Sequence, residues 1–121
     1  MDLAAVRKLA LALPEVEEST AYGSPAFKVR GKMLACIAIN KSAEPGSLVV
    51  MIDLEQRAAL LAESPDVYYL TGHYAPYPCV LVRLSKVNKD AMRDLLGGAW
   101  RYVTTNNAPQ KSVTKKAPKR K

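Results

Sequence analysis

Histidine and cysteine are scarce in this sequence of 121 residues, which contains one histidine and two cysteines. A structural zinc site needs four ligands, and the two cysteines do not form a C-x-x-C pair. There is also no glycine-rich loop of the kind that holds a nucleotide phosphate, because the glycines stand singly or as the pair Gly97-Gly98 within a helical pattern. The sequence therefore predicts no bound metal and no cofactor.

Long apolar runs are also missing. The run from 33 to 39 is seven residues long, whereas a membrane-spanning helix needs about 18 or more. The first residues follow a helical pattern without the apolar core of a signal peptide. We therefore expect a cytoplasmic protein without a membrane partner. Cys36 and Cys79 lie in strand-like runs, so we expect both to be reduced thiols in the core.

Acidic residues are absent from residues 108–121, a segment that carries six of the 18 basic residues. The remaining 12 basic residues face 11 acids, so the body is close to +1 although the whole chain is +7. The six tail cations are Lys111, Lys115, Lys116, Lys119, Arg120 and Lys121. With two prolines and one bulky apolar residue, residues 108–121 are expected to form a disordered basic tail after a domain of residues 1–107. Such a tail either only solubilises the chain or attracts nucleic acid or an acidic protein.

Hydrophobic periodicity predicts three helices and five strands. The helices are expected at 3–13, from Asp53 to Ser64, and after Asn88; the strands are expected at 26–30, 33–39, 48–52, 67–70 and 79–84. Glu15, Glu17 and Glu18 are assigned to a solvated connector. The order α-β-β-β-α-β-β-α favours an α+β domain of two layers, in which helices cover one face of a single antiparallel sheet.

Local signals define the helix ends. Asp53 is placed to cap the amide of Gln56, and Asn88 is placed as the N-cap of the last helix. Gly97-Gly98 lies in the middle of that helix, where each glycine costs about 1 kcal/mol relative to alanine. Either the helix ends or kinks there, or it continues in weakened form; we favour the continuous helix.

Three cations lie around the first predicted hairpin. Period two places Lys28 and Arg30 on the face opposite Phe27 and Val29, and Lys32 follows the turn at Gly31. A hairpin tip with three cations suits contact with phosphates. Exposed strands also carry lysine to discourage edge pairing, which is the competing explanation.

The loop of residues 71–78 is the second candidate site. It contains the single histidine, His73, together with Tyr74 and Tyr77. These side chains either bind a ligand or protein, or hold the loop and fill the core. Cys79 is six residues from His73, but a thiol within an apolar strand is more typical of a small core residue than of a catalytic dyad.

Several of these segments together resemble the MmcQ/YjbR family. The resemblance covers roughly residues 1 to 105 and is carried by Leu13–Ser19, Tyr22–Lys32, Thr71–Tyr74, Tyr77-Pro78 and Val80–Leu84. It implies a compact α-β(3)-α-β(2)-α domain of the secretion-chaperone-like or CyaY-like type. For function it implies a proposed double-wing DNA-binding role, with no catalytic residues to transfer. The chain departs from the family at Cys79, where a bulky aromatic is expected, and at Gly97-Gly98.

We therefore expect a monomeric, non-enzymatic domain that binds nucleic acid weakly and without sequence preference. Binding would use the hairpin cations Lys28, Arg30 and Lys32 together with the basic tail. The alternative is a module that binds a protein or small ligand through His73, Tyr74 and Tyr77.

Overall fold

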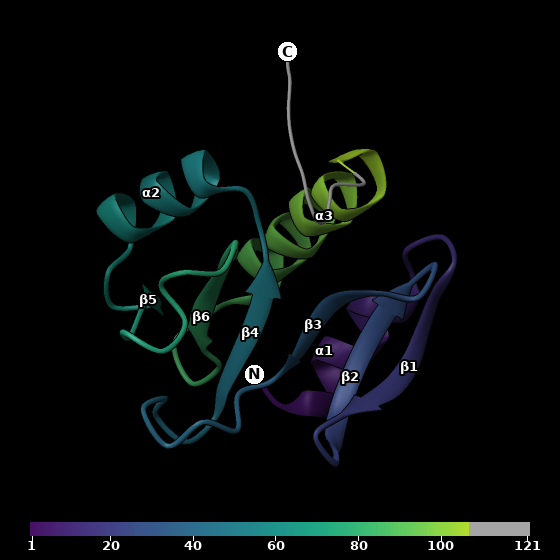
Figure 1. Cartoon of the computed structure of the whole chain (residues 1–121), viewed down its shortest axis with the longest axis horizontal. Helices are drawn as coiled ribbons and strands as arrows, with labels where there is room; N and C mark the ends of the chain where they lie inside the picture. Colours follow the sequence, from purple (N-terminus) through teal and green to yellow (C-terminus); the bar gives the residue numbers. More distant parts are fainter. Residues whose placement is uncertain (107–121) are drawn as a thin grey trace.

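The computed structural model describes residues 1–106 of the chain. Its elements are α1 (Leu3–Leu11), β1 (Val16–Ala21), β2 (Ser24–Val29), β3 (Lys32–Ile37), β4 (Ser47–Met51), α2 (Leu54–Glu63), β5 (Tyr68–Tyr69), β6 (Cys79–Arg83) and α3 (Lys89–Asn106). The strands form one antiparallel sheet in the order β1-β2-β3-β4-β6-β5. Figure 1 shows α1 and α3 together behind this sheet. The α+β class with two layers is confirmed, and the predicted tail lies outside the described residues.

The main core lies between the sheet and the helices α1 and α3. Alternation along β4 and β6 directs one set of side chains toward the helices. This set consists of Leu48, Val50, Val80 and Val82, all buried. Helical periodicity predicts an apolar face of α3 that meets them, and each residue of this face is buried: Met92, Leu95, Leu96, Ala99 and Val103.

The opposite face of β4 and β6 has a cover of its own. Val49, Leu81 and Cys79 are buried there in a second cluster, together with Tyr74 from the loop between β5 and β6. β4 and β6 are therefore buried on both faces, with helices on one side and a loop on the other.

The acidic segment after α1 differs from the prediction. Val16–Ala21 forms the edge strand β1, which pairs with β2 along its whole length, so four strands rather than three precede α2. The two strands are joined by Tyr22 and Gly23, whose φ angles of 55° and 80° are typical of the tight turns that fit twisted hairpins. The Tyr-Gly dipeptide was the available signal, but the adjacent glutamates favoured a connector. Glu17 and Glu18 are exposed, as a solvated segment requires, but they lie on a strand.

Helix ends and faces match the prediction with two exceptions. α1 ends at Leu11, two residues before the predicted boundary, and Leu13 packs against the core from outside the helix. In α2 the helical spacing predicts a buried stripe of Leu54, Ala58 and Leu61, but Leu54 is 58% exposed and Ala58 is also exposed. Leu61 contacts the core as predicted, together with Leu60, so α2 packs by its last turns.

The predicted caps are present in both later helices. The Asp53 Oδ1 accepts a hydrogen bond from the Gln56 N–H at 2.8 Å, and the Gln56 Nε2 donates to Asp53 Oδ2 at 2.8 Å. The Asn88 Oδ1 accepts from the Ala91 N–H at 2.8 Å. These bonds satisfy backbone donors that would otherwise lack partners in the first helical turn.

α3 continues through Gly97-Gly98, as predicted, and the two glycines have different surroundings. A Cβ atom at Gly98 would lie 3.0 Å from Gln56 Oε1 and 3.4 Å from Ile52 Cδ1. A Cβ atom at Gly97 would meet only the Arg101 side chain, at 3.6 Å. Gly98 therefore allows the start of α2 to approach α3 closely, whereas Gly97 has no such packing role.

This difference predicts that alanine substitutions at the two glycines change the free energy of unfolding differently. Gly97→Ala should raise the free energy of unfolding by up to about 1 kcal/mol, because alanine favours the helix and meets no obstacle. Gly98→Ala should gain clearly less or lose stability, because Gln56 is held by its hydrogen bond to Asp53 and must shift. Urea unfolding of both variants measures the difference. Equal gains would contradict the assigned packing role of Gly98.

Candidate functional site

The predicted basic hairpin lies beside the acidic strand that the sequence did not predict. Arg30 and Gly31 form the β2–β3 turn, with φ angles of 54° and 78°. From that turn, the Arg30 Nε donates to the Glu15 Oε1 at 2.6 Å. Lys28 lies directly opposite Glu17 in the β1–β2 register. Side chains directly opposite on neighbouring strands are close enough for opposite charges to attract.

The hairpin cations are therefore accompanied by carboxylates. Lys28 and Arg30 each have an acid as a neighbour, and Lys32 is exposed at the start of β3. An exposed ion pair contributes little to stability, but it lowers the positive potential that a phosphate would meet. Sequence reasoning identified the three cations and missed this compensation, because it placed the acids in a connector.

Other arginines of the domain also face carboxylates. Arg7 on α1 donates to Glu18 on β1 at 2.7 and 3.0 Å. Arg83 on β6 donates in the same bidentate way to Glu44, at 3.0 and 2.8 Å. Hydrogen bonding to each guanidinium holds the pKa of Glu18 and of Glu44 below the usual carboxyl value. Within residues 1–106, four arginines thus have their positive charge matched by a carboxylate: Arg7, Arg30, Arg83 and Arg93.

The six predicted tail cations, Lys111, Lys115, Lys116, Lys119, Arg120 and Lys121, lie outside the described residues.

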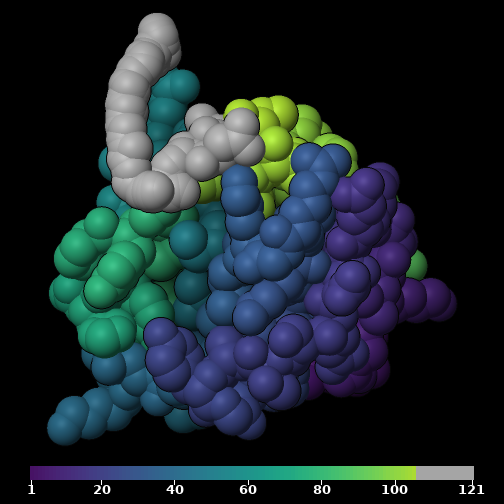
Figure 2. Space-filling model, turned by 45° about the vertical axis from the view of Figure 1, so that its right-hand side comes forward, coloured from purple at the N-terminus to yellow at the C-terminus, as the bar shows by residue number. Residues whose placement is uncertain are grey.

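The second candidate site, the loop of residues 71–78, divides its three predicted residues between the core and the surface. Tyr74 is 9% exposed, and its hydroxyl accepts the Asn40 N–H at 3.3 Å. His73 is exposed and contacts the Tyr74 ring edge-on at 4.8 Å between centroids, while Tyr77 is 55% exposed. Figure 2 shows this loop region in green at the surface, on the opposite side of the view from the purple N-terminal residues. His73 and Tyr77 are thus available to a partner, and Tyr74 is a core residue.

Arg57 on α2 fixes the conformation of this loop. Its Nη1 donates to the carbonyl oxygens of Ala75, Tyr77 and Cys79 at 3.2, 2.8 and 3.2 Å. A guanidinium suits this role because its planar donors can serve several acceptors at once. No sequence pattern indicates this role of Arg57, because every residue has a carbonyl acceptor and the side-chain pattern does not show which ones are used.

Cys79 is positioned as a core thiol. Its Sγ donates to the Tyr74 carbonyl oxygen at 3.7 Å, so its hydrogen bond goes to the backbone and not to an imidazole. Burial raises the pKa of the Cys79 thiol to about 11, and burial also raises the pKa of Cys36. A nucleophilic cysteine requires the opposite shift. Both cysteines are free thiols.

A second polar cluster connects the β3–β4 linker to β5 and β6. The Arg83 guanidinium lies 4.3 Å from the centre of the Tyr69 ring, and the Tyr69 hydroxyl accepts the Glu44 N–H at 2.8 Å. The same hydroxyl hydrogen-bonds Ser47, the buried polar residue of β4. These contacts hold the linker against the sheet edge, which is a structural role.

Comparison with known proteins places these features in a family. The YjbR family model matches residues 11–102, and the chain therefore belongs to the YjbR family. A crystal structure of protein DR2400 from Deinococcus radiodurans, with a DUF419 domain, superimposes with a TM-score of 0.68 over 88% of this chain and 80% of that one. Its identity is 24%, so this likeness shows the fold.

The sequence relatives are uncharacterized mycobacterial proteins. One from Mycobacterium bovis and two from Mycobacterium tuberculosis are 43% identical over 42 residues, which is 35% of this chain. The matched segment spans about a third (33%) of the length of these relatives.

No helix within residues 1–106 is both long and apolar enough to cross a membrane. In the same part of the chain, no three side chains of the His, Cys, Asp or Glu type gather in a way that could hold a metal ion.

The assignment of Cys79 as a core thiol predicts slow alkylation. With a pKa of about 11, the thiol is ionised in only about one molecule in a thousand at pH 8. Iodoacetamide should therefore modify the half-buried Cys36 first in native protein, and Cys79 only at the rate of unfolding. Peptide mass spectrometry measures both rates. Rapid modification of Cys79 at pH 7 would contradict the assignment and indicate an activated thiolate.

Proposed function

We propose that this protein binds nucleic acid weakly and without sequence preference, chiefly through the cations of residues 108–121. The charge distribution is the observation that supports this proposal. The body is close to +1, and nearly all of the net +7 comes from six tail cations. Long-range attraction to a polyanion follows the net charge, so it must come mainly from the tail.

The folded hairpin contributes less in this proposal than its three cations suggest. Arg30 is paired with Glu15 at 2.6 Å, and Lys28 lies opposite Glu17. A phosphate approaching these cations has to displace or share a carboxylate. The hairpin then orients the bound nucleic acid strand and adds little affinity. It does not need to contact the bases.

A second candidate function is a protein- or ligand-binding module that uses the exposed rings of His73 and Tyr77. The observation that favours it is the Arg57 clamp, which holds the backbone of this loop through three carbonyl oxygens. A loop held in one conformation loses less conformational entropy on binding. Tyr74, predicted as a third binding residue, serves this function only through its edge-on ring contact with His73.

The proposal predicts a large difference between two sets of substitutions in the full chain. Replacing all six tail cations by Gln should abolish most DNA binding, whereas replacing Lys28, Arg30 and Lys32 by Gln should weaken it only a few-fold. If all six tail cations meet phosphates, log affinity should fall against log salt with a slope of about −5. Fluorescence anisotropy with two unrelated duplexes at several salt concentrations measures affinity, slope and sequence preference.

Two outcomes would overturn the proposal. A tail-substituted chain that keeps its affinity, or that distinguishes the two duplexes, would show that the folded body reads DNA. A full chain that ignores both duplexes at low salt would remove nucleic acid as the ligand. His73→Ala separates the second candidate, because it leaves DNA binding intact and should remove binding through the loop without lowering the melting temperature.

A further inference from the structure

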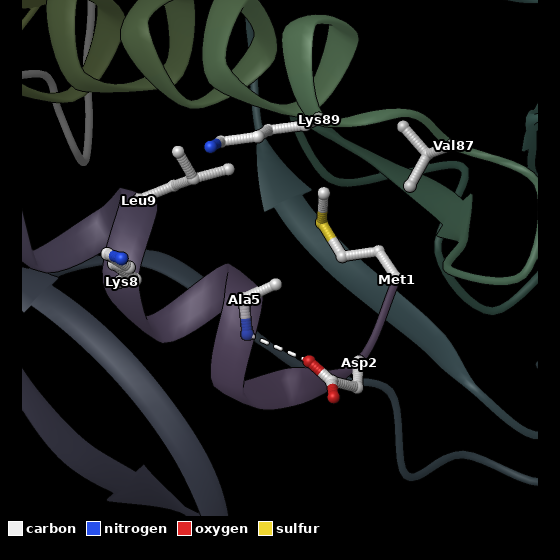
Figure 3. A pocket seen from close by; sticks show the side chains of 7 residues that line it. All are labelled: Met1, Asp2, Ala5, Lys8, Leu9, Val87 and Lys89. Carbon is white, nitrogen blue, oxygen red and sulfur yellow. Dashed lines mark hydrogen bonds between the residues drawn. The ribbon is translucent and has the colours of Figure 1, made fainter.

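A cavity of about 570 Å³ lies where the start of α1 meets the start of α3, away from the hairpin and from residues 71–78. Figure 3 shows its lining, with Lys89 extending from α3 toward Leu9 of α1. The volume is within the range of small-molecule sites, which is about 300–1,000 Å³. The functions proposed above make no use of it.

Two lysines from different helices line this cavity. Lys8 belongs to α1 and Lys89 to α3, and both are exposed. Neither forms an ion pair with a carboxylate of residues 1–106, unlike Arg7, Arg30, Arg83 and Arg93. Two unpaired ammonium groups on one concave surface repel each other, and an anion between them would relieve that repulsion.

The position of Lys89 strengthens this point. Asn88 caps α3, so Lys89 is the first residue of the helix, where the backbone N–H groups already create a positive potential. A cation is unfavourable at that end of a helix, and an acid is the usual choice. Lys89 therefore adds to an existing anion-attracting field.

The remaining walls of the cavity are mostly apolar. Met1, Leu9 and Val87 line it, and Met1 and Leu9 pack partly buried against the main core. Asp2 is the acidic residue of the lining, and its Oδ1 is engaged by the Ala5 N–H at 2.9 Å as the cap of α1. The Met1 ammonium, which donates to the Leu84 carbonyl oxygen at 2.6 Å, adds a third positive charge to those of the two lysines. After the Asp2 charge is subtracted, the lining keeps an excess of positive charge, which suits an anion.

We propose that this cavity binds a small amphiphilic monoanion, with a carboxylate head between Lys8 and Lys89 and a short apolar chain against Met1, Leu9 and Val87. The lysine stems add apolar surface beside their ammonium groups, so head and chain are both accommodated by the same side chains. This site is independent of nucleic acid binding by the tail.

Octanoate is a suitable probe for the full chain without an N-terminal tag, because Met1 lines the cavity. Titration followed by amide chemical shifts should show saturable changes at Ala5, Leu9 and Val87. Octanol, which has the same chain length without the charge, should bind at least ten-fold more weakly. Acetate, which has the head without the chain, should cause no saturable change. Octyl phosphate tests whether the site accepts another anionic head.

Lysine-to-methionine variants identify the charge requirement while keeping an apolar side chain. Lys8→Met and Lys89→Met should each weaken octanoate binding several-fold, and the double variant should bind octanol and octanoate equally. Lys86→Met is the matched control, since Lys86 is exposed near Val87 but does not line the cavity. All three lysines are exposed, so melting temperatures should stay unchanged.

Three outcomes would overturn the proposal. Equal binding of octanol and octanoate by the unaltered chain would show that the site does not recognise the charge. Unchanged octanoate affinity in the double variant would exclude the two lysines. Shifts confined to residues outside the cavity would place any binding elsewhere.

Discussion

The pairing of β4 with β6 is the constraint on which the rest of the fold depends. These strands lie next to each other within the sheet, are joined by five register pairs and are buried on both faces. Each face therefore needs a cover. α1 and α3 cover the side of Leu48 and Val82, and the loop carrying Tyr74 covers the side of Val49 and Leu81. The Arg57 clamp follows from this need, because a loop that covers a core must keep its backbone in place.

The other half of the sheet sets the electrostatic character of the body. β2 is shared by β1 and β3, so its cation Lys28 has the acid Glu17 of β1 as a neighbour. The turn that follows β2 brings Arg30 to Glu15. Pairing β1 with β2 thus converts a basic hairpin into a nearly balanced surface. Lys8 and Lys89, which line the cavity between α1 and α3, are among the cations of residues 1–106 that have no carboxylate partner.

The features that were predicted correctly are those determined by side-chain periodicity and by helix-capping residues. The buried face of α3, the caps Asp53 and Asn88 and the central strands all follow from side-chain spacing, and all are present. The strand β1 was not predicted, because an edge strand with exposed glutamates has the composition of a loop. The roles of Arg57 and of the Lys8–Lys89 pair also could not be predicted from the sequence. Their roles depend on carbonyl groups or on contacts between distant helices, which a one-dimensional pattern does not contain.

The most direct test is whether Glu15 and Glu17 reduce the contribution of the hairpin cations to DNA binding. In the full chain, Glu15→Gln with Glu17→Gln should free Lys28 and Arg30 and steepen the salt dependence of DNA binding by up to about 2 in slope. Glu55→Gln with Glu63→Gln changes the net charge equally on the exposed surface of α2 and serves as control. The slope should become steeper for the first pair of substitutions only. An unchanged slope, or the same change in both pairs, would contradict this prediction.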